Sequence, residues 1–198
     1  MKTIFFPATA RPHLARQVIL LDKLRQHFRV VISEYEPVGQ TMAEKSGRTT
    51  AHYFKQLEAV KPDILLIRGD RFELLPIAML GAYMGIKIAH LEAGDLSGVI
   101  DNKVRHAITQ LADVHFATNK ESYARLITMG TDPDKTFDFG SLDVEYTLSL
   151  GLEDFSAGGY AVICFHSTEE ENGAAIKDQF FPNLSLLRIK SNSDYGKQ

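Results

Sequence analysis

The chain has 198 residues, of which 44% are hydrophobic, so it is long enough to bury a sizeable core in one or two domains. Its formal net charge of −3 excludes a general positive field for nucleic acid or an anionic membrane, and we expect neither as a partner. Cys164 is the single cysteine, which excludes an internal disulfide. No apolar run approaches the roughly 20 residues that span a bilayer, and the start, MKTIFFPATARPH, does not read as a signal peptide, so we expect a cytoplasmic protein.

Short runs rich in Ile, Val and Phe alternate with longer segments of helical period, which is typical of a parallel sheet covered on both faces. The expected strands are residues 3–6, 29–33, 63–67, 87–91, 114–117 and 136–139. The expected helices are residues 14–27, 41–60, 72–84, 103–112 and 120–129. This alternation predicts a doubly wound, Rossmann-like α/β domain over residues 1–150.

A change of composition follows Leu150. The segment GLEDFSAGGY is rich in glycine, so residues 151–159 are predicted to be a linker. A second unit, residues 160–198, is then expected to hold a strand at 160–165, a helix at 169–180 and a strand at 185–189. This length is too short for an α/β domain of its own, so it either packs on the first domain or opens an incomplete second one.

Charged residues follow several of the predicted strands. Doubly wound sheets bind ligands beyond the carboxyl ends of their strands, where helix N-termini present free N–H groups. This rule brings Arg11, Asp70, Glu92 and Asp101 to one edge of the sheet. The edge is therefore the predicted ligand site.

Several of these residues, and two histidines at strand ends, could instead have a purely structural role. Asp70 and Asp101 both precede helices and would serve as N-caps, whereas Glu92 precedes a loop and has no such explanation. His90 ends an apolar strand and fits a hydrogen-bonded core histidine better than a ligand. His166 also ends a predicted strand, and its functional and structural readings are evenly balanced.

Three acids that converge on one cleft would repel each other and raise at least one pKa, as in carboxylates that act as general acids or bases. No H-x-x-x-H or D-x-D pair accompanies these acids, so no metal is expected. The first turn, PATARPH, lacks G-x-G-x-x-G, so no nicotinamide cofactor is expected either.

Taken together, these motifs resemble the UDP-N-acetylglucosamine 2-epimerases. The motifs are ARPH (10–13), RGDRFE (68–73), HLEAGD (90–95), ID with VRHAIT (100–109) and GSLD (140–143). The resemblance covers residues 1 to 150 and continues more weakly through FHSTEEENG (165–173) and SNSDYG (191–196). It is closer to the hydrolysing branch, because Asp95-Leu96 stands where the other branch usually has Leu-Arg after Glu-Ala-Gly.

The resemblance implies two Rossmann-like domains in the glycosyltransferase B arrangement, with a UDP-sugar between them and no metal or nicotinamide. It implies elimination of UDP across C1 and C2, then addition of water with inversion at C2, which gives N-acetylmannosamine for sialic or related acid synthesis. Departure of the diphosphate makes the C2 proton acidic, so a carboxylate placed against it can remove it. A second carboxyl would serve the hydration step.

The family's site residues carry over by motif. Asp70, Glu92 and Asp101 match its three acids, with Asp70 and Asp101 assigned to elimination and Glu92 to hydration. Arg11 matches its diphosphate-facing arginine and His166 its second-domain histidine.

Two further residues are assigned to substrate binding. They are Arg105, one helical turn from Asp101 and expected to orient it, and Ser141 of GSLD.

The chain departs from the family at several points. Thr9-Ala10 replace a Gly-Thr pair, the segment between Ser33 and Thr41 is shorter, and Asn102 stands where a second acid is frequent. The second domain ends early, so a homodimer or a complementing chain is expected. The alternatives are a non-catalytic nucleotide-sugar binding remnant or a subunit of a split enzyme and, more weakly, a glycosyltransferase.

Overall fold

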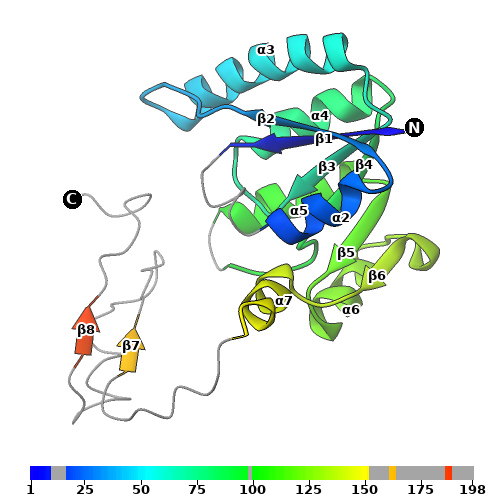
Figure 1. The fold of residues 1–198 in the computed structure, drawn as a ribbon. Coiled ribbons are helices and arrows are strands. Elements are labelled where there is room, and N and C mark those ends of the chain that lie inside the picture. Colours follow the sequence, from blue (N-terminus) through cyan, green and yellow to red (C-terminus); the bar gives the residue numbers. More distant parts are fainter. Residues whose placement is uncertain (10–16, 98–99, 152–160, 164–185, 189–198) are drawn as a thin grey trace. The chain divides into compact units, whose positions relative to one another are not determined.

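The computed structural model describes residues 1–9, 17–97, 100–151, 161–163 and 186–188 (Figure 1). The chain divides into two compact units, Met1–Leu150 and Gly151–Gln198. In the second unit, β7 (Ala161–Ile163) pairs in parallel with β8 (Leu186–Arg188). The helix expected at 169–180, most of the expected linker, and the first residues of the helix expected at 14–27 lie outside the described residues.

The first unit is built on one parallel six-stranded sheet in the order β2-β1-β3-β4-β5-β6. Its strands are β1 (Thr3–Ala8), β2 (Arg29–Glu34), β3 (Ile64–Arg68), β4 (Lys87–Leu91), β5 (Val114–Ala117) and β6 (Thr136–Asp138). Its helices are α2 (Val18–Arg25), α3 (Met42–Val60), α4 (Leu74–Tyr83), α5 (Asp101–Leu111), α6 (Lys120–Thr128) and α7 (Leu142–Ser149), with a 3₁₀ turn at Pro133–Lys135. The predicted doubly wound parallel fold is confirmed.

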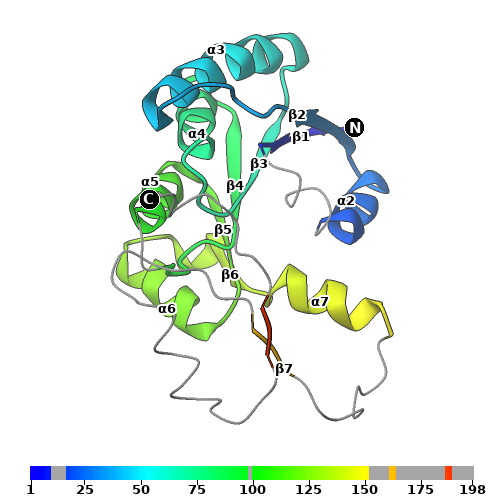
Figure 2. The ribbon, with the colours of Figure 1, turned by 90° about the vertical axis from the view of Figure 1, so that its left-hand side faces the viewer.

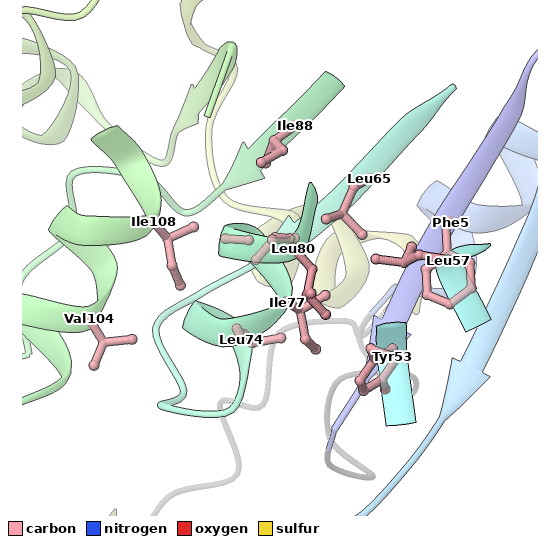
Figure 3. Packing of buried hydrophobic residues seen from close by; sticks show 12 residues of the cluster. Phe5, Tyr53, Leu57, Leu65, Leu74, Ile77, Leu80, Ile88, Val104 and Ile108 are labelled. Carbon is pink, nitrogen blue, oxygen red and sulfur yellow. The ribbon is translucent and has the colours of Figure 1, made fainter. Parts of the chain in front are cut away.

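Helices cover both faces of the sheet, with α3, α4 and α5 on one face and α2 and α7 on the other (Figure 2). Alternation along the strands explains the two layers, because successive side chains point to opposite faces. Phe5 and Leu65 pack with Tyr53 and Leu57 of α3 and Ile77 of α4 (Figure 3). Their chain neighbours Ile4, Phe6 and Leu66 belong to the core on the other face.

The order of the strands reverses between β1 and β3, which is the position where doubly wound sheets bind ligands. The ladder between β1 and β3 pairs only Ile4 with Ile64 and Phe5 with Leu65. The ladder between β1 and β2 continues to Ala8, past Pro7, which has no N–H to donate. The last residues of β1 therefore pair with β2 but not with β3, at the position where the strand order reverses.

The sequence-based assignment is incomplete at the end of this unit. The strand predicted at about 136–139 is present as β6 and ends at Asp138, but α7 was not predicted at all. α7 begins at the N-cap Ser141, whose hydroxyl accepts a hydrogen bond from the backbone N–H of Asp143 at 3.2 Å. None of the helices in the described part of the chain is long and apolar enough to cross a membrane.

Candidate functional site

Two of the predicted acids follow adjacent strands directly. Asp70 comes after β3 and Gly69, and Glu92 comes immediately after β4. The backbone N–H of Gly69 donates to the carbonyl of Leu91 at 3.0 Å, which ties the two strand ends together. Gly69, which precedes Asp70, has φ +79°, and Glu92 itself has φ +60°, so the backbone adopts the left-handed conformation at or next to each acid. The carboxyl edge of β3 and β4 is therefore the centre of the site.

Asp70 is held by an arginine from α5. Arg105 donates from Nη2 to Asp70 Oδ2, and both side chains are largely buried. Ser97 Oγ lies 3.5 Å from the same oxygen. Arg105 was expected to orient Asp101. Its hydrogen bond goes to Asp70 instead, while its charge acts on the Asp101 carboxyl and opposes the rise in the pKa of that group, so an orienting role toward Asp101 stays a prediction. Asp70 does not cap α4, since Glu73 holds the N-cap position.

Asp101 is the first residue of α5 rather than its N-cap, which is Ile100. Burial raises the pKa of the Asp101 carboxyl, and the nearby charge of Asp70 raises it further. The direction agrees with the prediction for the three acids, but burial is the larger cause, and of the other two acids only Asp70 contributes. Asp70 and Asp101 thus form a pair of carboxyls whose charges interact.

Glu92 is held by Arg68, the last residue of β3. The guanidinium donates from Nε to Glu92 Oε1 at 2.6 Å, and Nη2 lies 2.5 Å from the same oxygen. Nη2 also donates to Asp143 Oδ1 of α7 at 2.7 Å. Sequence reasoning missed Arg68 and Asp143, although Arg68 stands at a strand end and Asp143 closes the GSLD motif. The rule that found Asp70 and Glu92 would have found Arg68 as well.

His90 supports the loop that carries Asp70. Its Nε2 lies 2.9 Å from the carbonyl oxygen of Gly69, and its Nδ1 lies 3.2 Å from Thr109 Oγ1. Complete burial lowers the pKa of His90 to about 3, so the ring is neutral. A carbonyl only accepts, so Nε2 carries the proton and Nδ1 accepts from the Thr109 hydroxyl. The interpretation of His90 as a core histidine is confirmed.

The remainder of the HLEAGD motif serves packing. Asp95 Oδ1 accepts hydrogen bonds from the hydroxyls of Thr118 and Ser122, both at 2.6 Å. Gly94 has φ +80°, and a Cβ on it would lie 2.5 Å from the carbonyl oxygen of Ser122. This part of the motif therefore fixes the start of α6 against the end of β4.

The other predicted site residues are divided between described and undescribed parts of the chain. Ser141 caps α7 at the same edge of the sheet, whereas Arg11 and His166 lie outside the described residues. Asn102 accepts from the N–H and hydroxyl of Ser97, at 2.6 and 3.0 Å, and so holds that serine beside Asp70. Among the described residues, no group of three or more His, Cys, Asp or Glu side chains is arranged to hold a metal ion.

The edge thus carries two groups of charged side chains. Asp70 and Asp101 lie with Arg105 toward α5, and Glu92 lies with Arg68 toward α7. A carboxyl whose pKa is raised by burial and by a neighbouring carboxyl is suited to exchange a proton with a ligand. The chemistry that this arrangement supports is proton transfer to and from a bound ligand.

A family model described as UDP-N-acetylglucosamine 2-epimerase matches residues 13–192. A Neisseria meningitidis protein, "UDP-N-acetylglucosamine 2-epimerase", is 28% identical over 81% of this chain and 47% of its own length. A Campylobacter jejuni protein, "GDP/UDP-N,N'-diacetylbacillosamine 2-epimerase (hydrolyzing)", is 37% identical over 69% of this chain and 41% of its own. The chain therefore spans about half the length of the curated relatives it matches.

The fold is shared with solved structures. The S. aureus MnaA–UDP co-structure has a TM-score of 0.75 and 18% sequence identity, and it covers 94% of this chain and 61% of the other. At this identity, the likeness shows the fold and leaves the chemistry to be argued from the residues.

Proposed function

The chain belongs to the UDP-N-acetylglucosamine 2-epimerase family, and from this premise we propose that it acts on a UDP-linked 2-acetamido sugar and inverts C2. The observation that carries the proposal is the group of carboxyls at the carboxyl edge of β3 and β4. Within it, Asp101 has its pKa raised by burial and by Asp70. Such a pair suits removal of a proton from carbon once a leaving group begins to depart.

The proposed reaction begins with elimination. A carboxylate, Asp70 or Asp101, takes the C2 proton, and the C1–O bond breaks with its electron pair leaving on UDP. This step gives a C1–C2 double bond in the sugar. Water then adds its hydroxyl to C1 and a proton reaches C2 from the opposite face, with Glu92 serving this hydration. The products are N-acetylmannosamine and UDP.

Negative charge develops on the diphosphate as it departs, so cationic side chains nearby would stabilise it. We assign this role to Arg11 and His166, as the family motifs suggest. Arg105 and Ser141 are assigned to substrate binding.

The hydrolysing course of the reaction is supported by one of the similar proteins. The C. jejuni relative has the word "hydrolyzing" in its name. The proposal also includes three further points. The product would supply sialic or related acid synthesis, the protein would be cytoplasmic, and it would act as a homodimer or together with a complementing chain. The alternative is a non-catalytic nucleotide-sugar binding module.

Turnover and binding, measured on the same protein, separate the two functions. With UDP-N-acetylglucosamine, we expect the wild-type chain to release UDP and Glu92→Gln to slow that release by about 100-fold. UDP affinity measured by calorimetry should change by no more than about threefold, because Glu92 acts on the sugar. Glu58→Gln, an exposed glutamate on α3, is the matched control and should behave as wild type. Saturable UDP binding without any UDP release would contradict the enzyme and support the binding module.

A further inference from the structure

We infer that Arg68 is a positioning residue that holds Glu92 by one carboxylate oxygen and leaves the other free to face the ligand. This inference rests on the proposed function, because it concerns the acid assigned to hydration. It adds a residue to the site that the motif comparison did not assign.

The contacts of Arg68 are concentrated on a single oxygen. Both Nε and Nη2 approach Glu92 Oε1, at 2.6 and 2.5 Å, instead of spreading over the two oxygens of the carboxylate. Within the described residues, hydrogen bonds reach Oε1 only. Oε2 lies over Gly69, where a built Cβ would be 3.5 Å from it. Oε2 is therefore the oxygen available for proton transfer, directly beside the loop that carries Asp70.

The backbone of Glu92 also needs an external constraint. Its φ of +60° lies in the left-handed region, which residues other than glycine adopt rarely. Such conformations persist when the surrounding structure over-determines them, and they cluster at functional sites. The Arg68 clamp supplies one such constraint, because it fixes the side chain that this backbone conformation directs.

Arg68 is itself held on its other side. Its side chain is only 5% exposed, and Nη2 donates to Asp143 of α7. Burial disfavours its charge, but the charges and hydrogen bonds of Glu92 and Asp143 outweigh burial and raise the pKa of Arg68. The Glu92 side chain remains 22% exposed. A fixed, buried cation therefore holds a carboxylate that a ligand can still reach.

Turnover tests whether this contact positions Glu92 or only stabilises the fold. We expect Arg68→Gln to lower kcat for UDP release by about 100-fold, as small misplacements of reacting groups do. KM for UDP-N-acetylglucosamine should stay within about threefold, and Arg68→Lys should recover part of kcat. Arg48→Gln, which removes the exposed pair with Glu44 on α3, is the matched control and should keep wild-type kcat. If Arg68→Gln lowers the unfolding midpoint but keeps the wild-type kcat, the inference is overturned.

A second readout does not depend on turnover. With glutamate labelled at the carboxyl carbon, the Glu92 signal, assigned by its loss in Glu92→Gln, should shift in Arg68→Gln and stay in place in Arg48→Gln. Arg48→Gln should instead shift the Glu44 signal, which shows that the method detects a lost guanidinium. An unmoved Glu92 signal in Arg68→Gln overturns the inference. If wild-type protein releases no UDP, the proposed function fails, and the carbon signal alone decides whether Arg68 holds Glu92.

Discussion

At the scale of single residues, the loop before α4 depends on a neutral histidine. His90 donates to the Gly69 carbonyl and accepts from Thr109, so it links β4, the β3 loop and α5 inside the core. Asp70 follows Gly69 directly and takes its position from this support. The histidine therefore acts on the site through the backbone, without reaching the ligand edge itself.

His90→Leu should lower the free energy of unfolding by about 1 to 3 kcal/mol, because the Gly69 carbonyl and the Thr109 hydroxyl lose their buried partner. Urea unfolding at pH 7.5 would measure the loss. His27→Leu, at an exposed histidine after α2, is the control and should change the same quantity by less than about 0.5 kcal/mol. Equal effects of the two substitutions would show that the His90 hydrogen bonds add nothing.

The interaction of Asp70 with Asp101 is open to direct titration. The Asp70 charge contributes to the raised pKa of Asp101, so Asp70→Asn should move the Asp101 midpoint to lower pH. The unpaired Arg105 in that variant acts in the same direction. Carboxyl carbon chemical shifts followed against pH would give the midpoint. Asp22→Asn, at an exposed position on α2, should leave it unchanged, and an unmoved midpoint in Asp70→Asn would refute the coupling.

At the scale of elements, two glycines flank α6 and differ in what surrounds them. Gly94 precedes it in sequence and packs against its first turn, where a Cβ would meet the Ser122 carbonyl oxygen at 2.5 Å. Gly130 follows its end with a similar φ of +88° and open space around the Cβ position. Both need the left-handed backbone, but only Gly94 also needs the space.

Gly130→Ala should therefore cost about 1 kcal/mol, the penalty of the left-handed backbone for a residue with a Cβ. Gly94→Ala should cost about 1 to 3 kcal/mol more, because the added methyl forces α6 away from the end of β4. Thermal and urea unfolding of the two variants give the comparison. A Gly94→Ala protein as stable as Gly130→Ala would mean that α6 can move without cost.

The elements with a long regular pattern were predictable from the sequence. All six strands of the main sheet were expected from their apolar runs, and α3 was expected at 41–60; the structure shows Thr41 capping it through the Glu44 N–H at 3.1 Å. α7 was missed because it has only eight residues and buries none of them fully. Its cap, Ser141, was interpreted only as a binding residue.

The sequence predicted the acids of the candidate site but not the contacts that hold them. The strand-end rule brought Asp70 and Glu92 to one edge, but their partners come from distant parts of the chain. Arg68 and Asp143 are separated by 75 residues, and Arg105 and Asp70 by 35. Such contacts depend on how helices pack against the sheet, which local spacing does not encode.

At the scale of the whole molecule, histidines should make the fold sensitive to acid. Burial lowers the pKa of His52, His90, His106 and His115 below the ordinary value of 6.5. The unfolded chain therefore binds more protons than the folded chain as the pH falls below 6.5. The stability that these groups contribute is present above pH 6.5 and is lost as the pH falls toward their folded pKa values.

From pH 6.5 to pH 5, His90 alone should remove about 2 kcal/mol, because each pKa unit corresponds to about 1.4 kcal/mol. Urea unfolding at pH 7.5, 6.5 and 5 would measure the slope. His90→Leu should flatten it, since the variant has no proton to take up there. A slope that His90→Leu leaves unchanged would show that other groups cause the acid loss.

The central claim is that the acids at the carboxyl edge of β3 and β4 remove the proton from C2 of the sugar. Incubation of the chain with UDP-N-acetylglucosamine in deuterated water, followed by proton NMR, tests it directly. The account predicts UDP release together with N-acetylmannosamine that carries deuterium at C2, because the proton removed exchanges with solvent before one is returned. UDP release with the original proton retained at C2, or no release at all, would contradict it.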